Sequence, residues 1–215
     1  MMISTSNQKL EPFYRFFETH GTERLNGLNE SYFRDLNAGE KEEAWNFLIK
    51  RGLSEETIKG LYLLDKERAI GVIARSLTSP METSQYPAEQ EELERTRLSM
   101  IGYVNSVDPD ERYIAAMCDF ALSRFESVRA LFAQSLPVHR VTSGAVEALK
   151  GMVFTETETI PLSSAITKLM AIHGLEFDRH DPLYKSIYMA LRSDEHKEKV
   201  SAIRRLEAIQ EPDYM

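Results

Sequence analysis

The chain has little cysteine and no long apolar run. Cys118 is the one cysteine among 215 residues, which excludes an internal disulfide, and the helical apolar pattern around it marks it as a small core residue. No stretch approaches the roughly 20 consecutive apolar residues of a membrane-spanning helix. Residues 1–9 lack the basic start and apolar segment of a secretory signal. We therefore expect a cytoplasmic protein without a membrane partner.

The sequence also lacks the short motifs that dictate chemistry. It contains no Gly-rich phosphate loop, no His-Glu-x-x-His, no Gly-x-Ser-x-Gly and no paired-cysteine motif. No cofactor is predicted for this reason, and enzymatic activity is not the preferred interpretation.

Positive charge is scarce as well. Asp and Glu number 34 against 26 Lys and Arg, and most of the excess falls in residues 81–135, which carry 10 acidic and 5 basic side chains. Binding to nucleic-acid phosphates requires clustered Lys and Arg, so this balance weighs against a nucleic-acid partner. It is compatible with a partner protein that has a basic surface.

The acidic side chains are densest over residues 82–94, around Pro87 and in the first turns of a predicted helix. No Lys or Arg occurs between Arg75 and Arg95. The candidate partner-binding residues in this interval are Glu82, Glu89, Glu91, Glu92 and Glu94. The alternative is that most of them only open a helix after Pro87, where acidic side chains favour the positive end of the helix dipole.

Helical patterns fill most of the chain, and no segment has the alternation of a strand. Hydrophobic residues make up 42% and charged residues 28%, the ordinary range for a globular protein. Caps, prolines and apolar stripes predict about eleven helices and therefore an all-α fold. The clearest ranges are 40–51, 54–62, 65–77, 89–107, 111–122, 126–136, 142–154, 161–174, 182–191 and 195–209.

We predict one domain over residues 1–215. Residues 1–38 would form an N-terminal helical cap, with a short helix ending at Gly21 and a second one carrying apolar residues from Leu25 to Leu36. Residues 39–209 would form stacked helical hairpins, interrupted by an irregular loop at 78–87, and residues 210–215 would be a loose tail.

Two helix ends share a pattern. Ile73-Ala-Arg-Ser-Leu77 and Phe132-Ala-Gln-Ser-Leu136 lie fifty-nine residues apart and suggest a helical repeat. Phe125-Glu-Ser-Val-Arg129, continuing to Leu136-Pro137, resembles the second helix of a HEAT repeat. Weaker copies begin at Asp65 and Asp194. The resemblance implies an irregular HEAT-like α-solenoid or stack of hairpins, because the offset exceeds the roughly 40–47 residues of one HEAT unit.

Two polar segments are candidates for chemistry. A metal site could use His173, Glu176, His180 and Asp181, since imidazole and carboxylate both bind divalent ions. The preferred interpretation is that His173 continues an apolar helix stripe instead. Glu156 and Glu158, in Thr155-Glu-Thr-Glu-Thr159, could perform acid–base work, but a solvated loop between helices is preferred.

The leading functional prediction is a non-catalytic protein that binds another protein. In size, charge and predicted architecture the chain resembles bacterial immunity proteins, and that resemblance implies that it would neutralise a toxin by covering its active or binding surface. The alternatives are a metal-dependent enzyme using residues 173–181 and a general helical-repeat scaffold. The sequence leaves the oligomeric state open.

Overall fold

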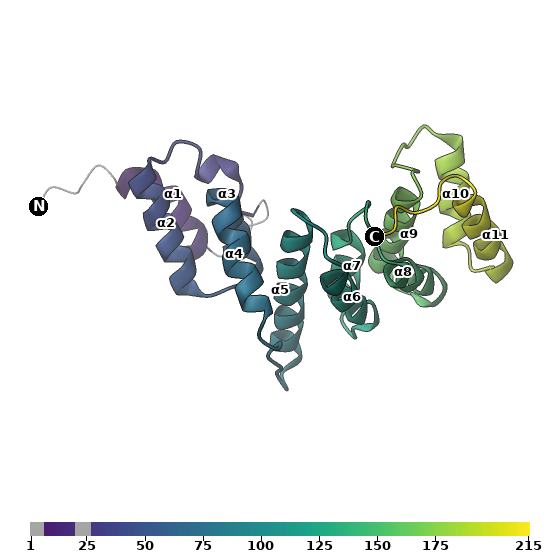
Figure 1. Cartoon of the computed structure of the whole chain (residues 1–215), viewed down its shortest axis with the longest axis horizontal. Helices are drawn as coiled ribbons and strands as arrows, with labels where there is room; N and C mark the ends of the chain where they lie inside the picture. The colour runs from purple at the N-terminus through teal and green to yellow at the C-terminus, as the bar shows by residue number, and fades with distance from the viewer. Residues whose placement is uncertain (1–6, 20–26) are drawn as a thin grey trace, which may run out of the picture. The chain divides into compact units, whose positions relative to one another are not determined.

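The computed structural model describes residues 7–19 and 27–215, and this part of the chain is almost entirely helical (Figure 1). It contains eleven α-helices, two 3-10 helices and one isolated β-bridge, which confirms the all-α prediction. The α-helices are α1 (Asn7–Glu18), α2 (Ala38–Arg51), α3 (Glu55–Leu64), α4 (Lys66–Leu77), α5 (Pro87–Asn105), α6 (Glu111–Cys118), α7 (Glu126–Ser135), α8 (Ser143–Thr155), α9 (Thr159–Ile172), α10 (Pro182–Arg192) and α11 (His196–Glu207). The 3-10 helices are η2 (Glu30–Tyr32) and η3 (Asp119–Leu122).

Capping side chains set the helix starts that the sequence suggests. Asn37 and Glu40 form a reciprocal capping box at α2, in which the Asn37 backbone N–H donates to Glu40 Oε2 at 2.7 Å and the Glu40 N–H donates to Asn37 Oδ1 at 3.0 Å. Asp65 ends α3 and caps α4 through the Arg68 N–H. These local bonds explain why the boundaries follow from sequence alone.

Two predicted helices differ from the structure. The helix predicted over 111–122 is divided, because α6 ends at Cys118 and the chain tightens into η3. The second helix predicted in the N-terminal cap, with apolar residues from Leu25 to Leu36, is not formed over its described residues. They contain only the 3-10 helix η2. Asn29 caps η2 and Asn37 caps α2, which leaves too few residues between the two caps for a longer helix. Residues 20–26, including Gly21 and Leu25, lie outside the described part.

The chain divides into two compact units, residues 1–80 and 81–215, with the division inside the predicted loop. Whether they act as one domain stays a prediction. In the first unit, α2 packs on α3 and α3 on α4. An aromatic cluster joins α1 to α2, because Phe13 and Phe17 each lie 5.4–5.5 Å, centroid to centroid, from the ring of Phe47.

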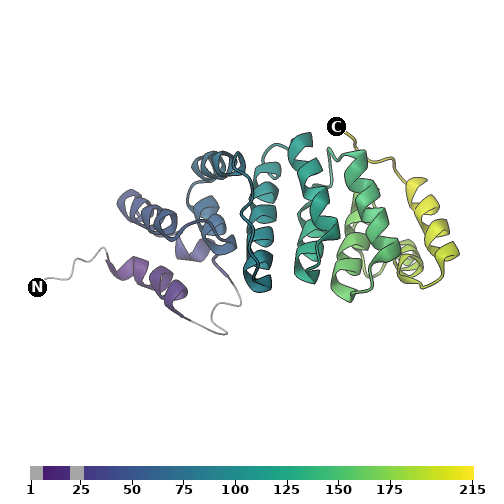
Figure 2. The same ribbon diagram turned by 90° about the horizontal axis from the view of Figure 1, so that it is seen from below.

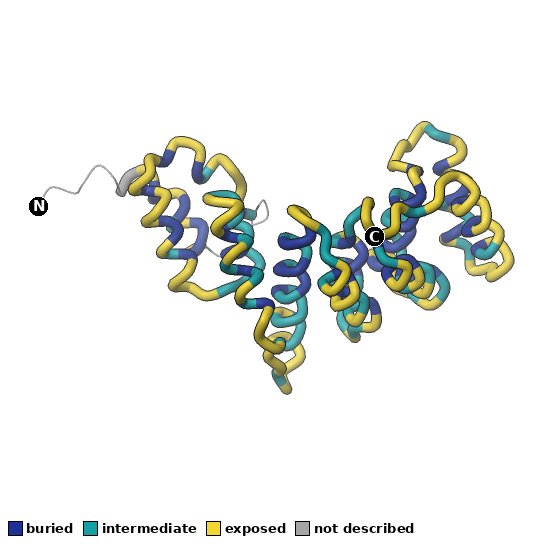
Figure 3. Tube along the Cα trace, viewed as in Figure 1, coloured by how far each residue is buried: buried dark blue, intermediate teal, exposed yellow. Residues whose placement is uncertain are grey.

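In the second unit, each helix packs on neighbours close to it in the chain (Figures 1 and 2). Helices α5, α7, α9 and α10 contact one another in that order, and α6, α8 and α11 form a second series of contacts. The sides facing neighbouring helices are buried and the opposite sides are exposed (Figure 3). Membership of the HEAT-like class stays a prediction.

The last residues of the chain have partners, unlike the predicted loose tail. Val141 N–H donates to the Asp213 carbonyl at 2.8 Å, and Met215 N–H donates to the Val141 carbonyl at 3.1 Å. Their isolated bridge places the tail beside the segment that precedes α8. Backbone groups carry these bonds, so the residue types of the tail do not reveal them.

Candidate functional site

A hollow of about 590 Å³ lies on the face of the second unit where α5, α7 and α9 are neighbours; we name it the α5–α7–α9 hollow. It is lined by Glu91, Arg95, Arg124, Phe125, Glu126, Ser127, Ala130, Leu131, Gln134 and Ile160. Two of these side chains are acidic and two are basic, so charge of both signs surrounds an apolar part.

The apolar part of the α5–α7–α9 hollow is accessible. Ile160, in the first turn of α9, is 60% exposed, and Phe125 and Leu131 are half-buried. The Arg124 guanidinium lies 4.6 Å from the centre of the Phe125 ring, a distance at which a cation is attracted to the face of an aromatic ring. Helix packing thus leaves an apolar patch with a stacked arginine open to solvent.

Two of the predicted acidic residues extend from α5 to the start of α7. Glu91 Oε1 accepts a hydrogen bond from the Ser127 hydroxyl, and Glu94 Oε2 accepts one from the Ser123 hydroxyl at 2.6 Å. The α7 N-terminus has no side-chain cap of its own. Carboxylates from α5 therefore stabilise the positive end of the α7 dipole, a structural role that the sequence does not reveal.

The other three predicted acidic residues are exposed. Glu82 lies in the irregular segment, Glu89 accepts a hydrogen bond from the Ser84 hydroxyl in the first turn of α5, and Glu92 lies one turn further along. The five glutamates consequently lie in two groups. Glu91 alone among them lines the α5–α7–α9 hollow.

No protein-family model, curated protein or solved structure matches the chain. Across residues 7–19 and 27–215, no helix combines the length and the apolarity needed to cross a membrane.

The candidate metal ligands do not converge. His173 is buried and its Nδ1 lies 2.7 Å from the Gln210 carbonyl oxygen, whereas Glu176 is exposed on the following loop. His180 Nε2 accepts from Arg179 Nε at 2.9 Å, and Asp181 caps α10 through the Leu183 N–H. Within the described ranges, no three His, Cys, Asp or Glu side chains gather closely enough to hold a metal ion.

His173 confirms the packed alternative. The Gln210 carbonyl can only accept, so His173 Nδ1 carries the proton of this hydrogen bond. Nε2 is buried and has no hydrogen-bond partner among residues 7–19 and 27–215. The imidazole joins the end of α9 to the segment after α11.

Glu156 is the residue whose role the sequence hides most. Its side chain is 5% exposed and forms a two-pronged pair with Arg129, at 2.6 Å to Nε and 3.1 Å to Nη2. Burial alone would raise the pKa of Glu156, but hydrogen bonds from Arg129 and from the backbone N–H groups of Glu158 and Thr157 lower it below its usual value. The predicted solvated loop is therefore wrong for this residue.

Lys199 reaches the same end of α8. Its Nζ donates to the Val153 carbonyl at 2.7 Å. Arg129 and Lys199 both occupy the fourth position of their helices, α7 and α11. Two cations from different helices thus meet the negative end of the α8 dipole, where positive charge is stabilising. This arrangement ties α7 and α11 to the end of α8.

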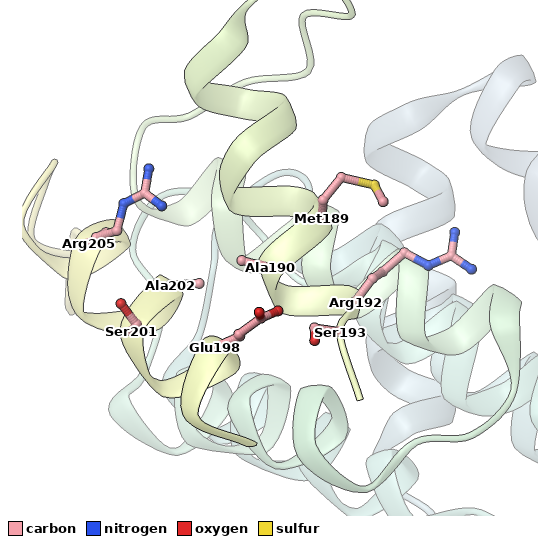
Figure 4. Close-up of a pocket in the computed structure, with 8 residues that line it drawn as sticks. All are labelled: Met189, Ala190, Arg192, Ser193, Glu198, Ser201, Ala202 and Arg205. Atoms are coloured by element: carbon pink, nitrogen blue, oxygen red, sulfur yellow. The ribbon is translucent and has the colours of Figure 1, made fainter. Parts of the chain in front are cut away.

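A second hollow, of about 790 Å³, lies between α10 and α11 (Figure 4). Arg192 and Arg205 extend on opposite sides of it, and Glu198 lies between them. The arginines do not converge on one point, and Met189, 65% exposed, is the large apolar side chain at its edge. The lining of this α10–α11 hollow has no aromatic side chain, whereas the α5–α7–α9 hollow has Phe125 beside two large aliphatic side chains.

Proposed function

We propose that the chain binds another protein, without catalysis, through the α5–α7–α9 hollow. The observation that carries the proposal is the 60% exposure of Ile160 beside Phe125 and its stacked Arg124. Protein interfaces are enriched in aromatic residues and arginine around an apolar centre with a polar rim. Exposure of such a patch to water is unfavourable, and burial of the patch against a partner is favourable.

Charge supports a partner with a basic surface. Residues 81–135 carry 10 acidic and 5 basic side chains, and Glu91 and Glu126 open on the α5–α7–α9 hollow. The exposed Glu82, Glu89 and Glu92 add negative charge around the start of α5. Complementary charge of this kind speeds association and selects partners more than it adds affinity.

The more specific proposal is that the chain is an immunity protein, which neutralises a toxin by covering its active or binding surface. The acidic excess and the α5–α7–α9 hollow support it, because both lie in the second unit and would meet a basic surface together. A general scaffold would use the same hollow without suppressing an activity of its partner.

Site-specific photo-crosslinking tests the binding proposal. A photoreactive amino acid at Ile160 is expected to crosslink one partner protein in lysate of the source cells. The same amino acid at Val107 is the control, because Val107 is 48% exposed but lies beyond the far end of α5, about 15 Å or more along the helix from Arg95. Equal crosslinking from both positions would contradict the assigned surface.

Expression of the captured partner separates the two functional alternatives. An immunity protein is expected to restore growth to cells that the partner alone kills. Its Ile160→Asp variant is expected to restore growth much less. A partner that is harmless when expressed alone would leave the scaffold alternative and exclude toxin neutralisation.

A further inference from the structure

A third hollow, of about 430 Å³, continues the same face along α7 and α9; we name it the α7–α9 hollow. It is lined by Gln134, Ser163, Ser164, Thr167, Lys168 and Ala171. Gln134 also lines the α5–α7–α9 hollow, so the two are adjacent. The lining contains one cation, an amide and three hydroxyls, and it contains no carboxylate.

Lys168 has no counter-ion among the described residues. Its Nζ donates to the Leu136 carbonyl, the last residue before Pro137, and burial lowers the pKa of the Lys168 ammonium. A carbonyl supplies only a partial negative charge and satisfies one of three N–H donors. A partly buried ammonium in this position is stabilised by an anion that reaches it.

Two of the three hydroxyls beside Lys168, those of Ser163 and Ser164, are arranged as donors, whereas the Thr167 hydroxyl is hydrogen-bonded to Tyr184. Ser164 Oγ accepts from Gln134 Nε2 at 3.0 Å, and Ser163 Oγ accepts from the Tyr188 hydroxyl at 3.2 Å. Each serine therefore keeps its own O–H for a further acceptor. Ser164 and Lys168 are four residues apart on α9 and lie on the same side of the helix.

We infer that the α7–α9 hollow binds the carboxylate of an Asp or Glu side chain of the partner protein. The inference deepens the proposed function, on which it rests, by adding an acidic anchor to a partner whose surface is otherwise basic. A carboxylate carries one negative charge and accepts several hydrogen bonds, which matches one ammonium and neighbouring hydroxyls. A phosphate carries up to two charges and suits a site with more cations.

Short peptides test the inference without the partner, so it can fail independently of the crosslinking experiment. The full chain, with ¹³C-labelled lysine, is titrated with acetyl-Gly-Glu-Gly-amide and with acetyl-Gly-Gln-Gly-amide, and the Lys168 side-chain resonances are followed. The Glu peptide is expected to saturate with a Kd at least fivefold lower than that of the Gln peptide. Lys185, an exposed lysine on α10, is the internal control and should not respond.

Three results would overturn the inference. Equal responses to the Glu and Gln peptides would exclude carboxylate recognition. A response of Lys185 as large as that of Lys168 would mean nonspecific charge attraction. Saturation by inorganic phosphate alone, with no response to the Glu peptide, would assign the hollow to phosphate instead.

Variants of the lining complete the test. Lys168→Met is not the variant of choice, because it also removes the hydrogen bond to the Leu136 carbonyl that packs α9 against the end of α7. Ser164→Ala removes one hydroxyl from a half-buried position and is expected to weaken binding of the Glu peptide at least threefold while the melting temperature stays within a few degrees. Unchanged binding by Ser164→Ala would exclude the assigned donor set.

Discussion

At the scale of single residues, the pair of Arg129 and Glu156 links α7 to the end of α8. Removing one partner of a buried pair leaves the other charge without compensation, which costs about 3 kcal/mol. Arg129→Met is therefore expected to lower the free energy of unfolding by about that amount in urea titrations. Arg112→Met is the control, because Arg112 pairs with Asp110 but its side chain is 85% exposed, and exposed pairs contribute about 0–1 kcal/mol.

The same pair predicts a dependence of stability on pH. The pKa of Glu156 is lowered in the folded state, so its contribution is present above the unfolded value of 4.5 and is lost as pH falls through the folded value. Glu156→Gln is expected to be less stable than wild type at pH 7, and the difference should shrink below about pH 4.5. A difference that stays constant from pH 7 to pH 3 would exclude an ionised Glu156 as the stabilising species.

The residue scale is where sequence reasoning loses most information. Glu156 and Glu158 look alike in Thr155-Glu-Thr-Glu-Thr159, but only Glu156 meets an arginine that lies 27 residues earlier. Helical periodicity predicts which residues are neighbours along one helix, and it does not predict a contact between side chains of different helices. His173 was predictable as a packed residue because it continues the apolar stripe of its own helix.

At the scale of helices, two glycines have opposite environments. A Cβ added at Gly60 in α3 would lie 2.9 Å from Leu48 Cδ1 and 3.0 Å from Leu28 Cδ1, and both leucines are fully buried. A Cβ at the exposed Gly71 in α4 would meet no atom within 4 Å. Gly60→Ala is expected to lower stability by about 1 kcal/mol through overpacking, and Gly71→Ala to raise it by about 0.5–1 kcal/mol.

Chemical denaturation of the two alanine variants measures both effects. They share one substitution and one secondary structure, so the intrinsic gain in helix propensity is common to them. Equal changes in the free energy of unfolding for the two variants would mean that Leu28 and Leu48 move without cost. That result would contradict the close approach of Gly60 in α3 to these two leucines.

The backbone hydrogen bonds between the C-terminal tail and Val141 lead to a further prediction. Val141 N–H is held by the Asp213 carbonyl, and Val141 is fully buried. Deleting residues 212–215 removes this acceptor, so hydrogen exchange of the Val141 amide is expected to accelerate at least tenfold. The Leu149 amide, within α8, is the control and should keep its protection. Fast exchange of Val141 in the intact chain would contradict the bridge.

Helices were predictable where local groups define them. Proline, capping side chains and apolar stripes placed α2, α4, α5 and α10 within about two residues, because their causes lie within one or two turns. The division of 111–122 and the short η2 depend on how neighbouring segments pack. A periodic pattern does not contain that information.

At the scale of the whole molecule, the charge pattern indicates the unit that contains the proposed site but not the apolar side chains exposed there. The acidic excess of residues 81–135 was evident, whereas the roles of Glu91 and Glu94 at the α7 N-terminus required the fold. Ile160 and Phe125 lie 35 residues apart and line one hollow only through the packing of α7 on α9. The basic partner and the toxin-neutralising role stay predictions.

The affinity of the purified complex tests the central claim most directly. Once crosslinking has identified the partner, its Kd is measured with wild-type chain, with Ile160→Asp and with Val107→Asp as matched control. Binding through the α5–α7–α9 hollow predicts that Ile160→Asp weakens the complex at least tenfold, about 1.4 kcal/mol, while Val107→Asp stays within twofold. Equal Kd values for the wild type and Ile160→Asp would contradict the claim.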